Sequence, residues 1–480
     1  MPFRKCGHWR RAGLPPVIIF LYLYLSLAPD LRLAVPEWIG INAVIVILLS
    51  TILLFAPSIE RQWSAAFILL VATVLRGLFL WRSPELSDDI YRYLFDGLMS
   101  IHGRNPYDMA PAVAANAMPA FSALAGQVNH PELPTIYPPA AQLVFAVGAV
   151  IGNVVGMKLV MVLIDLAGCA LILALLDRLR LPRNNAVIYA WHPLPVLEIA
   201  ASGHIDAAAV AFTLLALFFL LSGMAPGRPS SFSPKKTGKL AAFFTRPGPT
   251  GWAAGISFAL AVLTKWTPLI FAPGILLLTT STKGKYTRPG FLLTVAAMIV
   301  LFWPEVKNAF YTLSVYAANW EFSGFIFRCL RSSTGSGGAA RLIIAGTFLA
   351  AVGAVHFRLI NVRCRTSLAH ARDVFRCFYI TAALFLILTP TLHPWYGLYL
   401  VAFLPFAAGP AGVALSWSIF LAYRVVLLYG ITGQWIENDL VPFLIISAPA
   451  CALAAGLIAR SVRHWANADK SVPETSSPRC

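Results

Sequence analysis

Charged residues are scarce in this chain. Only 12% of its 480 residues are Asp, Glu, Lys or Arg, whereas soluble domains carry roughly 25%. A soluble fold of this size would lack the charge to cover its surface, and a hydrophobic content of 58% suits lipid as the outer solvent. The shortage excludes an ordinary water-soluble protein and indicates an integral membrane protein.

Several common motifs are also missing. The seven cysteines include no Cys-x-x-Cys pair, which argues against a zinc or redox motif, and only Cys329 falls in a predicted non-cytoplasmic loop. We find no Gly-rich phosphate loop, no Gly-x-Ser-x-Gly nucleophile motif and no internal repeat. A disulfide framework, a nucleotide-sugar-binding domain and a serine hydrolase are therefore not expected.

Apolar runs that approach the roughly 20 residues needed to cross a membrane recur from end to end. Examples are residues 16–34, 39–56, 65–81, 157–176, 339–357 and 440–458. The first run lacks a small-residue cleavage site, so we expect it to be retained as a span. The predicted fold is an all-α polytopic membrane protein with about 14 transmembrane helices (12–14).

Two apolar segments do not have the length of a single span. Residues 136–151 are predicted to form a juxtamembrane or re-entrant helix, because counting them as a span would put the basic residues after the next helix outside. Residues 251–280 would run about 45 Å as one helix, well beyond a 30 Å core. Lys265, Trp266 and Pro268 interrupt this run, which predicts a hairpin of two short helices.

The net charge of +17 follows from where the basic residues lie. With the N-terminus in the cytoplasm, 25 of the 37 Lys and Arg residues fall in cytoplasmic segments. The other face holds only Arg32, Arg82, Arg92, Arg104, Lys307, Arg328 and Arg331. This bias predicts cytoplasmic termini, an extracytoplasmic loop at 82–135 and a Pro/Gly/Ser/Lys-rich cytoplasmic linker at 224–250. It also explains the high charge without a nucleic-acid partner.

Acidic residues have the opposite bias, since 12 of the 20 fall in the non-cytoplasmic loops. The strongest motif there is SDDIYRYLFDGLMSIHGRNPYD, residues 87–108. Ser87 is a suitable helix N-cap, Asp88 and Asp89 fall in the first turn, and Gly103 is a suitable stop. Since the charge rule places no demand on acids, these residues indicate chemistry on this face.

Helical spacing places Asp88, Arg92 and Asp96 on one face of this helix and Asp89 with Tyr93 on the neighbouring one. A purely structural interpretation is an amphipathic interfacial helix in which Asp88 pairs with Arg92. The segments at 130–139, 191–207, 263–268 and 388–396 fall at the same membrane face by the charge count. Polar and aromatic residues that converge there favour a site.

The ordered set SDDIYRYLFDG, GRNPYD, PTIYPP, GHID, TKWTP and LHPWY resembles the GT-C-fold glycosyltransferases that use polyprenyl-phosphate sugars. The resemblance covers about residues 65 to 410 and points to the bacterial polyprenol-phosphate-mannose-dependent mannosyltransferases. It implies a lipid-linked sugar donor, a glycan or glycolipid acceptor, and inversion at the anomeric carbon. It also implies a bacterial inner-membrane protein with an outward-facing site. The spans ahead of the first large loop outnumber the single span of many relatives.

The resemblance implies that Asp88 and Asp89 are the catalytic carboxylates. A base must take the proton of the acceptor hydroxyl, and Asp89 is the better candidate if Asp88 pairs with Arg92. The phosphate leaving group calls for cations or donors, such as Arg92, Lys265, His393 and Arg424. The full set of predicted substrate-binding residues is Arg92, Tyr93, Asp96, Asn105, Tyr107, Tyr137, His204, Asp206, Lys265, His393, Trp395 and Tyr396.

Each helper also has a structural interpretation. Lys265 could snorkel to the interface, as we expect for Arg76, and His204 with Asp206 could cap a helix. Trp395 and Tyr396 are typical of an interfacial aromatic belt. No cofactor is expected besides the lipid-linked sugar; the acidic pair could hold a divalent ion, but nothing implies one. The rival functions are a transporter or flippase for a lipid-linked sugar and a scaffolding subunit.

Overall fold

The structure is a computed structural model that describes residues 6–55, 63–222, 247–281, 284–360 and 367–469. The named elements within these ranges are all helices, and two isolated β-bridges join Thr391 to Phe322 and Ser323. The prediction of an all-α protein is confirmed for this part of the chain. The predicted linker at 224–250 lies outside the described residues up to position 246.

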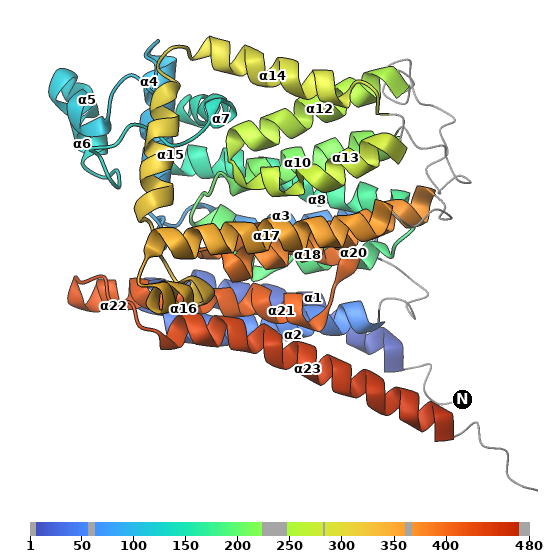
Figure 1. Ribbon diagram of the computed structural model, residues 1–480. Helices are drawn as coiled ribbons and strands as arrows, with labels where there is room; N and C mark the ends of the chain where they lie inside the picture. Colours follow the sequence, from blue (N-terminus) through green and yellow to red (C-terminus); the bar gives the residue numbers. More distant parts are fainter. Residues whose placement is uncertain (1–5, 56–62, 223–246, 282–283, 361–366, 470–480) are drawn as a thin grey trace, which may run out of the picture.

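The longer helices lie roughly side by side and form the bundle of Figure 1. They are α1 (Cys6–Ser26), α2 (Val35–Phe55), α3 (Ala65–Leu80), α8 (Val154–Arg178), α10 (Asp206–Ser222), α12 (Pro247–Thr264), α13 (Ala272–Ser281), α14 (Thr287–Leu301), α17 (Gly337–Ile360), α18 (Ser367–Leu388), α21 (Pro410–Ser418) and α23 (Leu440–Asp469). Helix α22 (Arg424–Thr432) extends from the left end of the bundle in Figure 1. Shorter helices within the bundle are α9 (Val187–Ala190), α19 (Gly397–Val401) and α20 (Leu404–Ala407).

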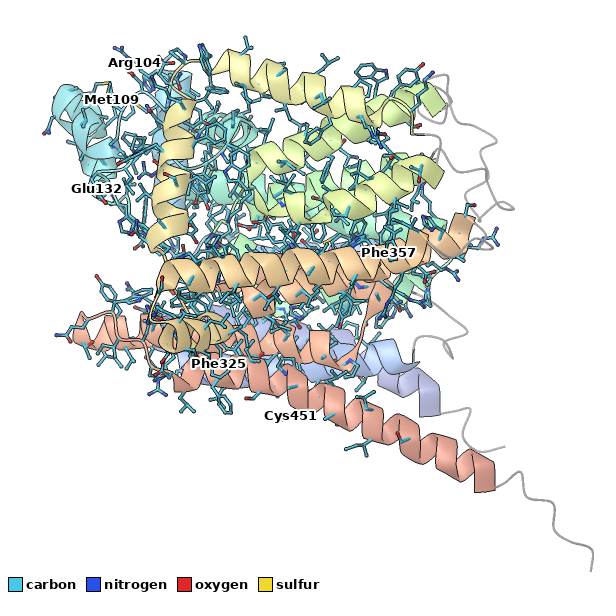
Figure 2. All side chains as sticks on the ribbon, in the orientation of Figure 1. Arg104, Met109, Glu132, Phe325, Phe357 and Cys451 are labelled. Carbon is cyan, nitrogen blue, oxygen red and sulfur yellow. The ribbon has the colours of Figure 1, made fainter. Side chains whose placement is uncertain are left out.

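A second set of helices lies at the left end of the bundle in Figure 1. It comprises α4 (Asp89–Ile101), α5 (Pro111–Ala117), α6 (Ser122–Ala125), α7 (Pro139–Ala149), α15 (Lys307–Asn319) and α16 (Phe325–Thr334). Helix α15 stands across the direction of the bundle, and Arg104, Met109 and Glu132 lie at this end while Phe357 lies toward the other (Figures 1 and 2). The helices of the predicted extracytoplasmic loop at 82–135 are thus at one end of the molecule.

Five helical stretches are long and apolar enough to cross a membrane: Val35–Ile52, Val154–Arg178, Gly337–Ile360, Pro410–Thr432 and Leu440–Ala459. Seven shorter apolar helices of 10–17 residues accompany them in the described residues. These lengths and compositions support a membrane protein. The number of about 14 spans stays a prediction.

The two segments of unusual length behave as their sequences indicate. Helix α7 has 11 residues, so it is about 16 Å long and too short to span, and it packs against α4. The run at 251–280 is divided into α12 and α13, with the break at Lys265 and Trp266.

Arg76 differs from the expectation that it snorkels. Its side chain is fully buried, and its Nε donates to Asp165 at 2.5 Å while its Nη1 donates to the carbonyl of Ala190 at 2.7 Å. The hydroxyl of Tyr189 donates to the other oxygen of Asp165 at 2.6 Å. A buried ion pair is tolerated when extra hydrogen bonds complete it, so these residues join α3 to α8 and α9 inside the bundle.

Candidate active site

Helix α4 carries the acidic motif and begins one residue later than predicted. Ser87 Oγ accepts a hydrogen bond from the backbone N–H of Asp89 at 3.3 Å, and the N-cap is Asp88, whose side chain makes no capping bond. The helix ends at Ile101, and Gly103 follows with a φ of +71°, a conformation that favours glycine. Asp89 is therefore the first residue of the helix.

Close packing against α7 fixes the direction of α4. A Cβ on Gly97 would lie 2.3 Å from the carbonyl oxygen of Phe145, so this crossing requires glycine. The Tyr93 ring stacks on Phe145 with centroids 4.5 Å apart, and Tyr137 meets Tyr93 edge-on at 5.1 Å. The Tyr137 hydroxyl then lies 3.3 Å from both Asp89 Oδ2 and the Tyr93 hydroxyl.

Asp89 points into the end of the bundle but stays reachable, because its side chain is 26% exposed. Burial raises the pKa of its carboxyl, and the nearby charge of Asp206 acts in the same direction. The charge of Lys265 and the hydrogen bond from Tyr137 lower that pKa in part. A carboxylate with a raised pKa binds a proton more readily, as a general base must.

Lys265 and Asp206 form an ion pair beside Asp89. Lys265 Nζ lies 2.6 Å from Asp206 Oδ2, with the two side chains 15% and 0% exposed. Asp206 begins α10 and Lys265 follows α12, two helices in extensive contact. Lys265 Nζ also lies 5.3 Å from the centre of the Tyr396 ring. Lys265 therefore does not simply extend to the membrane interface, and Asp206 does more than cap a helix.

Four rings from three segments form a continuous stack. His204 lies on Trp395 at 4.1 Å between centroids, Trp395 on His393 at 4.3 Å, and His393 on Phe322 at 4.9 Å. Burial, helped by the charge of Lys265, lowers the pKa of His393 to about 3. His393 is thus neutral in the free protein, so of the two roles left open by the sequence, cation or hydrogen-bond donor, it suits the donor.

His204 is fully buried between two carboxyl groups. Its Nδ1 lies 3.8 Å from Asp89 Oδ2 and its Nε2 lies 3.5 Å from Glu198 Oε2, and neither nitrogen has a hydrogen-bond partner among the described residues. Burial holds the pKa of His204 well below its usual value, and the charge of Lys265 contributes. Gly203 brings the ring here through a turn with φ of +82°, in which a Cβ would lie 2.5 Å from the Ile90 side chain.

Glu198 and Tyr423 were not predicted as site residues. Glu198 lies fully buried on a π-helix at Pro195–Ala201, and the Tyr423 hydroxyl lies 2.8 Å and 3.0 Å from its two oxygens. One signal was present in the sequence, since an acid inside the apolar run PVLEIAA is costly unless it has a role. The π-helix itself, a feature frequent at functional sites, is not visible in the sequence.

The predicted pairing of Asp88 with Arg92 is wrong. Arg92 donates to the carbonyls of residues 129, 130 and 133 at 3.3, 2.9 and 3.1 Å, so it binds the returning loop. Asp88 is exposed; partial burial raises its pKa and the charge of Arg32 opposes this. The preference for Asp89 as base therefore rests on its position beside Tyr137, His204 and Lys265 and not on that ion pair. These four residues, together with Glu198, Asp206, His393, Trp395, Tyr396 and Tyr423, are called the cluster below.

Three other predicted residues support the site from outside the cluster. Asp96 is buried between α4 and α7, where it accepts a hydrogen bond from Gln142 at 3.3 Å, and burial raises its pKa to about 6. Asn105 donates to Glu305 at 3.1 Å. The Tyr107 hydroxyl donates to the carbonyl of Tyr137 at 2.6 Å and so fixes the segment that carries this residue.

A comparison with known protein families identifies the type of reaction. The family model described as the N-terminal domain of alpha-(1->6)-mannopyranosyltransferase matches residues 35–281, just over half of the chain. The chain belongs to this family. Neither a curated protein nor a solved structure matches it. The resemblance to GT-C mannosyltransferases is confirmed: the protein is a mannosyltransferase, with a sugar donor and an acceptor as substrates.

The match to the alpha-(1->6)-mannopyranosyltransferase domain covers only part of the cluster. Asp89, Tyr137, His204, Asp206 and Lys265 lie inside it. His393, Trp395, Tyr396 and Tyr423 lie beyond it and complete the site from the C-terminal part of the chain. Within the described residues, no group of three or more His, Cys, Asp or Glu side chains is arranged to hold a metal ion.

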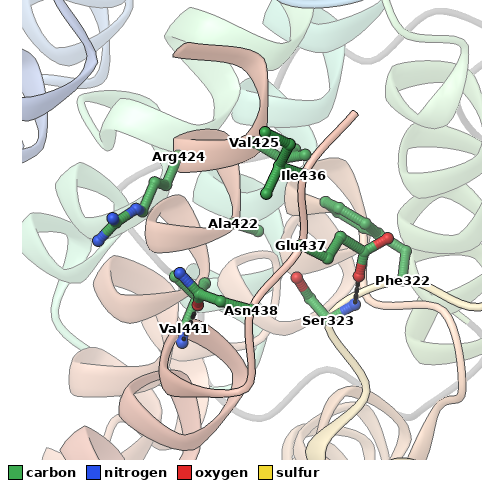
Figure 3. Close-up of a pocket in the computed structure, with 9 residues that line it drawn as sticks. All are labelled: Phe322, Ser323, Ala422, Arg424, Val425, Ile436, Glu437, Asn438 and Val441. Carbon is green, nitrogen blue, oxygen red and sulfur yellow. Dashed lines mark hydrogen bonds between the residues drawn. The ribbon is translucent and has the colours of Figure 1, made fainter. Parts of the chain in front are cut away.

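Arg424 does not belong to the cluster of this mannosyltransferase, contrary to its predicted role. It is exposed at the start of α22 and lines a small pocket whose other residues are Phe322, Ser323, Ala422, Val425, Ile436, Glu437, Asn438 and Val441. Figure 3 shows its side chain pointing away from Glu437. Glu437 is instead paired with Arg328, and the Phe322 ring lies between this pocket and His393.

Proposed function

We propose that this mannosyltransferase moves mannose from a polyprenyl-phosphate donor to a glycan or glycolipid acceptor with inversion at the anomeric carbon. The observation that carries the proposal is the meeting of three features at one end of the bundle. A reachable carboxylate, Asp89, lies beside the cation Lys265. An apolar cavity is lined by Trp266 and Pro138, the sequence neighbours of Lys265 and Tyr137.

Asp89 is the residue best suited to act as the base. The acceptor hydroxyl must lose its proton as its oxygen bonds to the anomeric carbon, and a carboxylate within hydrogen-bond reach can take that proton. Asp206 and Glu198 are fully buried, and the charge of Asp206 is already paired with that of Lys265. Asp89 alone of these three carboxyl groups is exposed enough to contact a substrate. Inversion places the base opposite the leaving phosphate.

The departing phosphate is an anion that needs a cation and hydrogen-bond donors rather than an acid. Lys265 supplies the charge, and its partial exposure lets a phosphate compete with Asp206 for the ammonium group. Trp266 Nε1 is buried and has no hydrogen-bond partner in the part of the chain that the structure describes, and His393 is neutral and able to donate. An anion bound beside His393 would also raise the pKa of that ring and strengthen the contact.

The apolar cavity suits the part of the donor's isoprenoid chain that lies nearest the phosphate. The cavity has a volume of about 220 Å³ and lies among α7, α12, α14 and α15. Its lining is formed by Pro138, Pro139, Val262, Leu263, Trp266, Phe291, Val295, Ile299, Val306, Ala309 and Phe310. An apolar chain gains the most from such a lining, and the cavity begins next to the residues proposed to bind the phosphate.

The cluster is proposed to face outward across a bacterial inner membrane. The support is the charge distribution, since the segments at this end of the bundle carry few Lys and Arg residues and most of the acids. A lipid-linked donor suits that location, because it stays in the bilayer beside the site.

The test is transfer of labelled mannose by the purified full-length protein in lipid nanodiscs, from polyprenyl-phosphate mannose to an extracted cell-envelope acceptor. Asp89→Asn should bind the donor but lose about 10² to 10⁴ in turnover, the usual cost of removing a general base. Asp88→Asn is the matched control and should lose less, because the Asp88 side chain is exposed and makes no capping bond. Near-normal turnover of Asp89→Asn would refute the assignment, and transfer from a nucleotide-linked mannose alone would refute the lipid donor.

A further inference from the structure

His204 has one carboxyl group near each ring nitrogen, Asp89 at Nδ1 and Glu198 at Nε2. This arrangement restricts which of the two carboxyl groups can be protonated. A neutral imidazole has one N–H and one lone pair. Both carboxyl groups can bond to it only when one is protonated, so that it donates to the lone pair, and the other is ionised, so that it accepts from the N–H. The distances of 3.5 Å to Glu198 and 3.8 Å to Asp89 are long for bonds. Catalytic contacts of this kind often shorten only when substrate is bound.

We propose that Asp89 and Glu198 share one proton across His204, and that Glu198 normally holds it so that Asp89 remains ionised. This inference rests on the proposed role of Asp89. Moving the proton breaks the Asp89 O–H bond and the Nε2–H bond while it forms the Nδ1–H bond and the Glu198 O–H bond. Atoms and charge balance, and no further reactant is needed. Glu198 then acts as a positioning residue, not as a group that touches substrate.

The surroundings of the two carboxyl groups decide where the proton resides. Glu198 is fully buried with the Tyr423 hydroxyl as its close polar contact, so its ionised form is disfavoured. Asp89 is 26% exposed and feels the charge of Lys265, which favours its ionised form. The proton therefore prefers Glu198, and the negative charge stays on the residue that can reach a substrate.

The ring stack holds His204 in the orientation needed to pass a proton between Asp89 and Glu198. Stacking on Trp395 at 4.1 Å holds the ring plane and leaves its two edges facing the two carboxyl groups. Among the described residues, the other titratable groups near this trio fall into three sets. Those around Asp89 are Lys265, Asp206, Tyr137, Tyr93, Asp88, Arg92, Tyr316 and Tyr423. Those around His204 are His393 and Lys265, and those around Glu198 are Tyr423 and Asp206. Lys265, already paired with Asp206, is the cation that acts on His204.

The sharpest test is infrared difference titration of the full-length protein in nanodiscs without substrate. The C=O band of Asp89 is identified by its loss in Asp89→Asn. In the wild type the Asp89 signal should change in two steps with pH, because coupled carboxyl groups titrate as a pair. The Asp89 carboxyl loses its proton in the lower step, and the band of its carboxylate shifts again when Glu198 releases its proton in the upper step. Glu198→Gln keeps the size and a donor at Nε2 but cannot release a proton, so the Asp89 band should change in one step. Asp177→Asn, the same kind of change at a remote ion pair with Arg183, should keep both steps.

Tyr423→Phe provides a milder variant if Glu198→Gln does not fold. Loss of the hydroxyl that donates to Glu198 should move the upper step to higher pH while both steps remain. In transfer assays of the wild type, the KM for the donor should rise about tenfold on the alkaline side, where Glu198 is ionised. A rise of this size is expected when one negative charge is added roughly 10 Å from the donor phosphate. Glu198→Gln should not show this rise.

An Asp89 band that titrates identically in wild type and Glu198→Gln would overturn the shared proton. Because that measurement uses no substrate, it is separate from the proposed function. Normal turnover in Asp89→Asn would instead contradict the function while leaving the titration result intact.

Discussion

The ion pair between Lys265 and Asp206 allows stability and donor binding to be measured separately. Lys265→Met would leave the Asp206 carboxylate fully buried without its cation, which lies 2.6 Å away in the native protein. Removing one partner of a buried pair typically costs about 3 to 5 kcal/mol. With the lysine side chain only 15% exposed, solvent screening reduces that cost little. Lys265→Met should therefore be clearly less stable than the wild type.

The double variant Lys265→Met/Asp206→Asn removes both charges together. Neutral replacement of a buried ion pair is often close to neutral for stability, so most of the lost stability should return. The two charges also act on the Asp89 pKa in opposite directions, so their joint removal disturbs the base less than either single change. Donor binding should not return, because the phosphate has still lost its cation.

The expected loss in donor binding follows from the energy of a hydrogen bond to a charged group, roughly 1.5 to 3 kcal/mol. That corresponds to a rise of about 10- to 150-fold in the KM for the polyprenyl-phosphate donor, in the single and the double variant alike. Thermal denaturation in detergent gives the stabilities, and transfer at varied donor concentration gives the KM. Recovery of the KM together with the stability in the double variant would refute the phosphate-binding role of Lys265.

Two further predictions concern the loop that carries the acidic motif. Burial raises the pKa of Asp96 to about 6, so the folded state holds this proton more tightly than the unfolded chain and stability falls as the pH rises from about 4 to about 6. Asp96→Asn should remove this pH dependence and raise the free energy of unfolding at pH 7 by about 3 kcal/mol, as measured by denaturation at about pH 4 and at pH 7. An unchanged pH dependence in this variant would contradict the raised pKa of Asp96. Reporter fusions at Pro111 and at Pro234, which lies outside the described residues, should report opposite compartments, and one shared compartment would contradict the predicted topology.

Sequence reasoning was most successful where one local pattern decides the outcome. The helix after Ser87, the break at Lys265 and the shortness of the helix at 136–151 each follow from capping, helix length or membrane thickness. These are properties of a few consecutive residues. They also brought most of the predicted site to one end of the bundle, because charge bias assigns loops to faces without knowledge of how the helices pack.

The failures involve side chains whose partners are distant in sequence. Helical spacing allowed Arg92 to pair with Asp88, but carbonyls of the returning loop some 37–41 residues away compete for the guanidinium. Arg76 was expected at the interface because Asp165, 89 residues later, could not be recognised as its partner. Glu198 had a visible signal as an acid in an apolar run, yet its contact with Tyr423 spans 225 residues.

The same long-range contacts show that the proposed active site draws residues from beyond the domain matched by the family. Residues 35–281 supply Asp89, His204 and Lys265, but the ring that covers His204 comes from Trp395 and the hydroxyl on Glu198 from Tyr423. Without those residues His204 would lose its stacking partner, and water would reach the buried carboxyl. Burial raises the pKa of Asp89, and the burial of Glu198 disfavours its ionised form. The basicity of a residue near the start of the chain therefore depends on helices formed near its end.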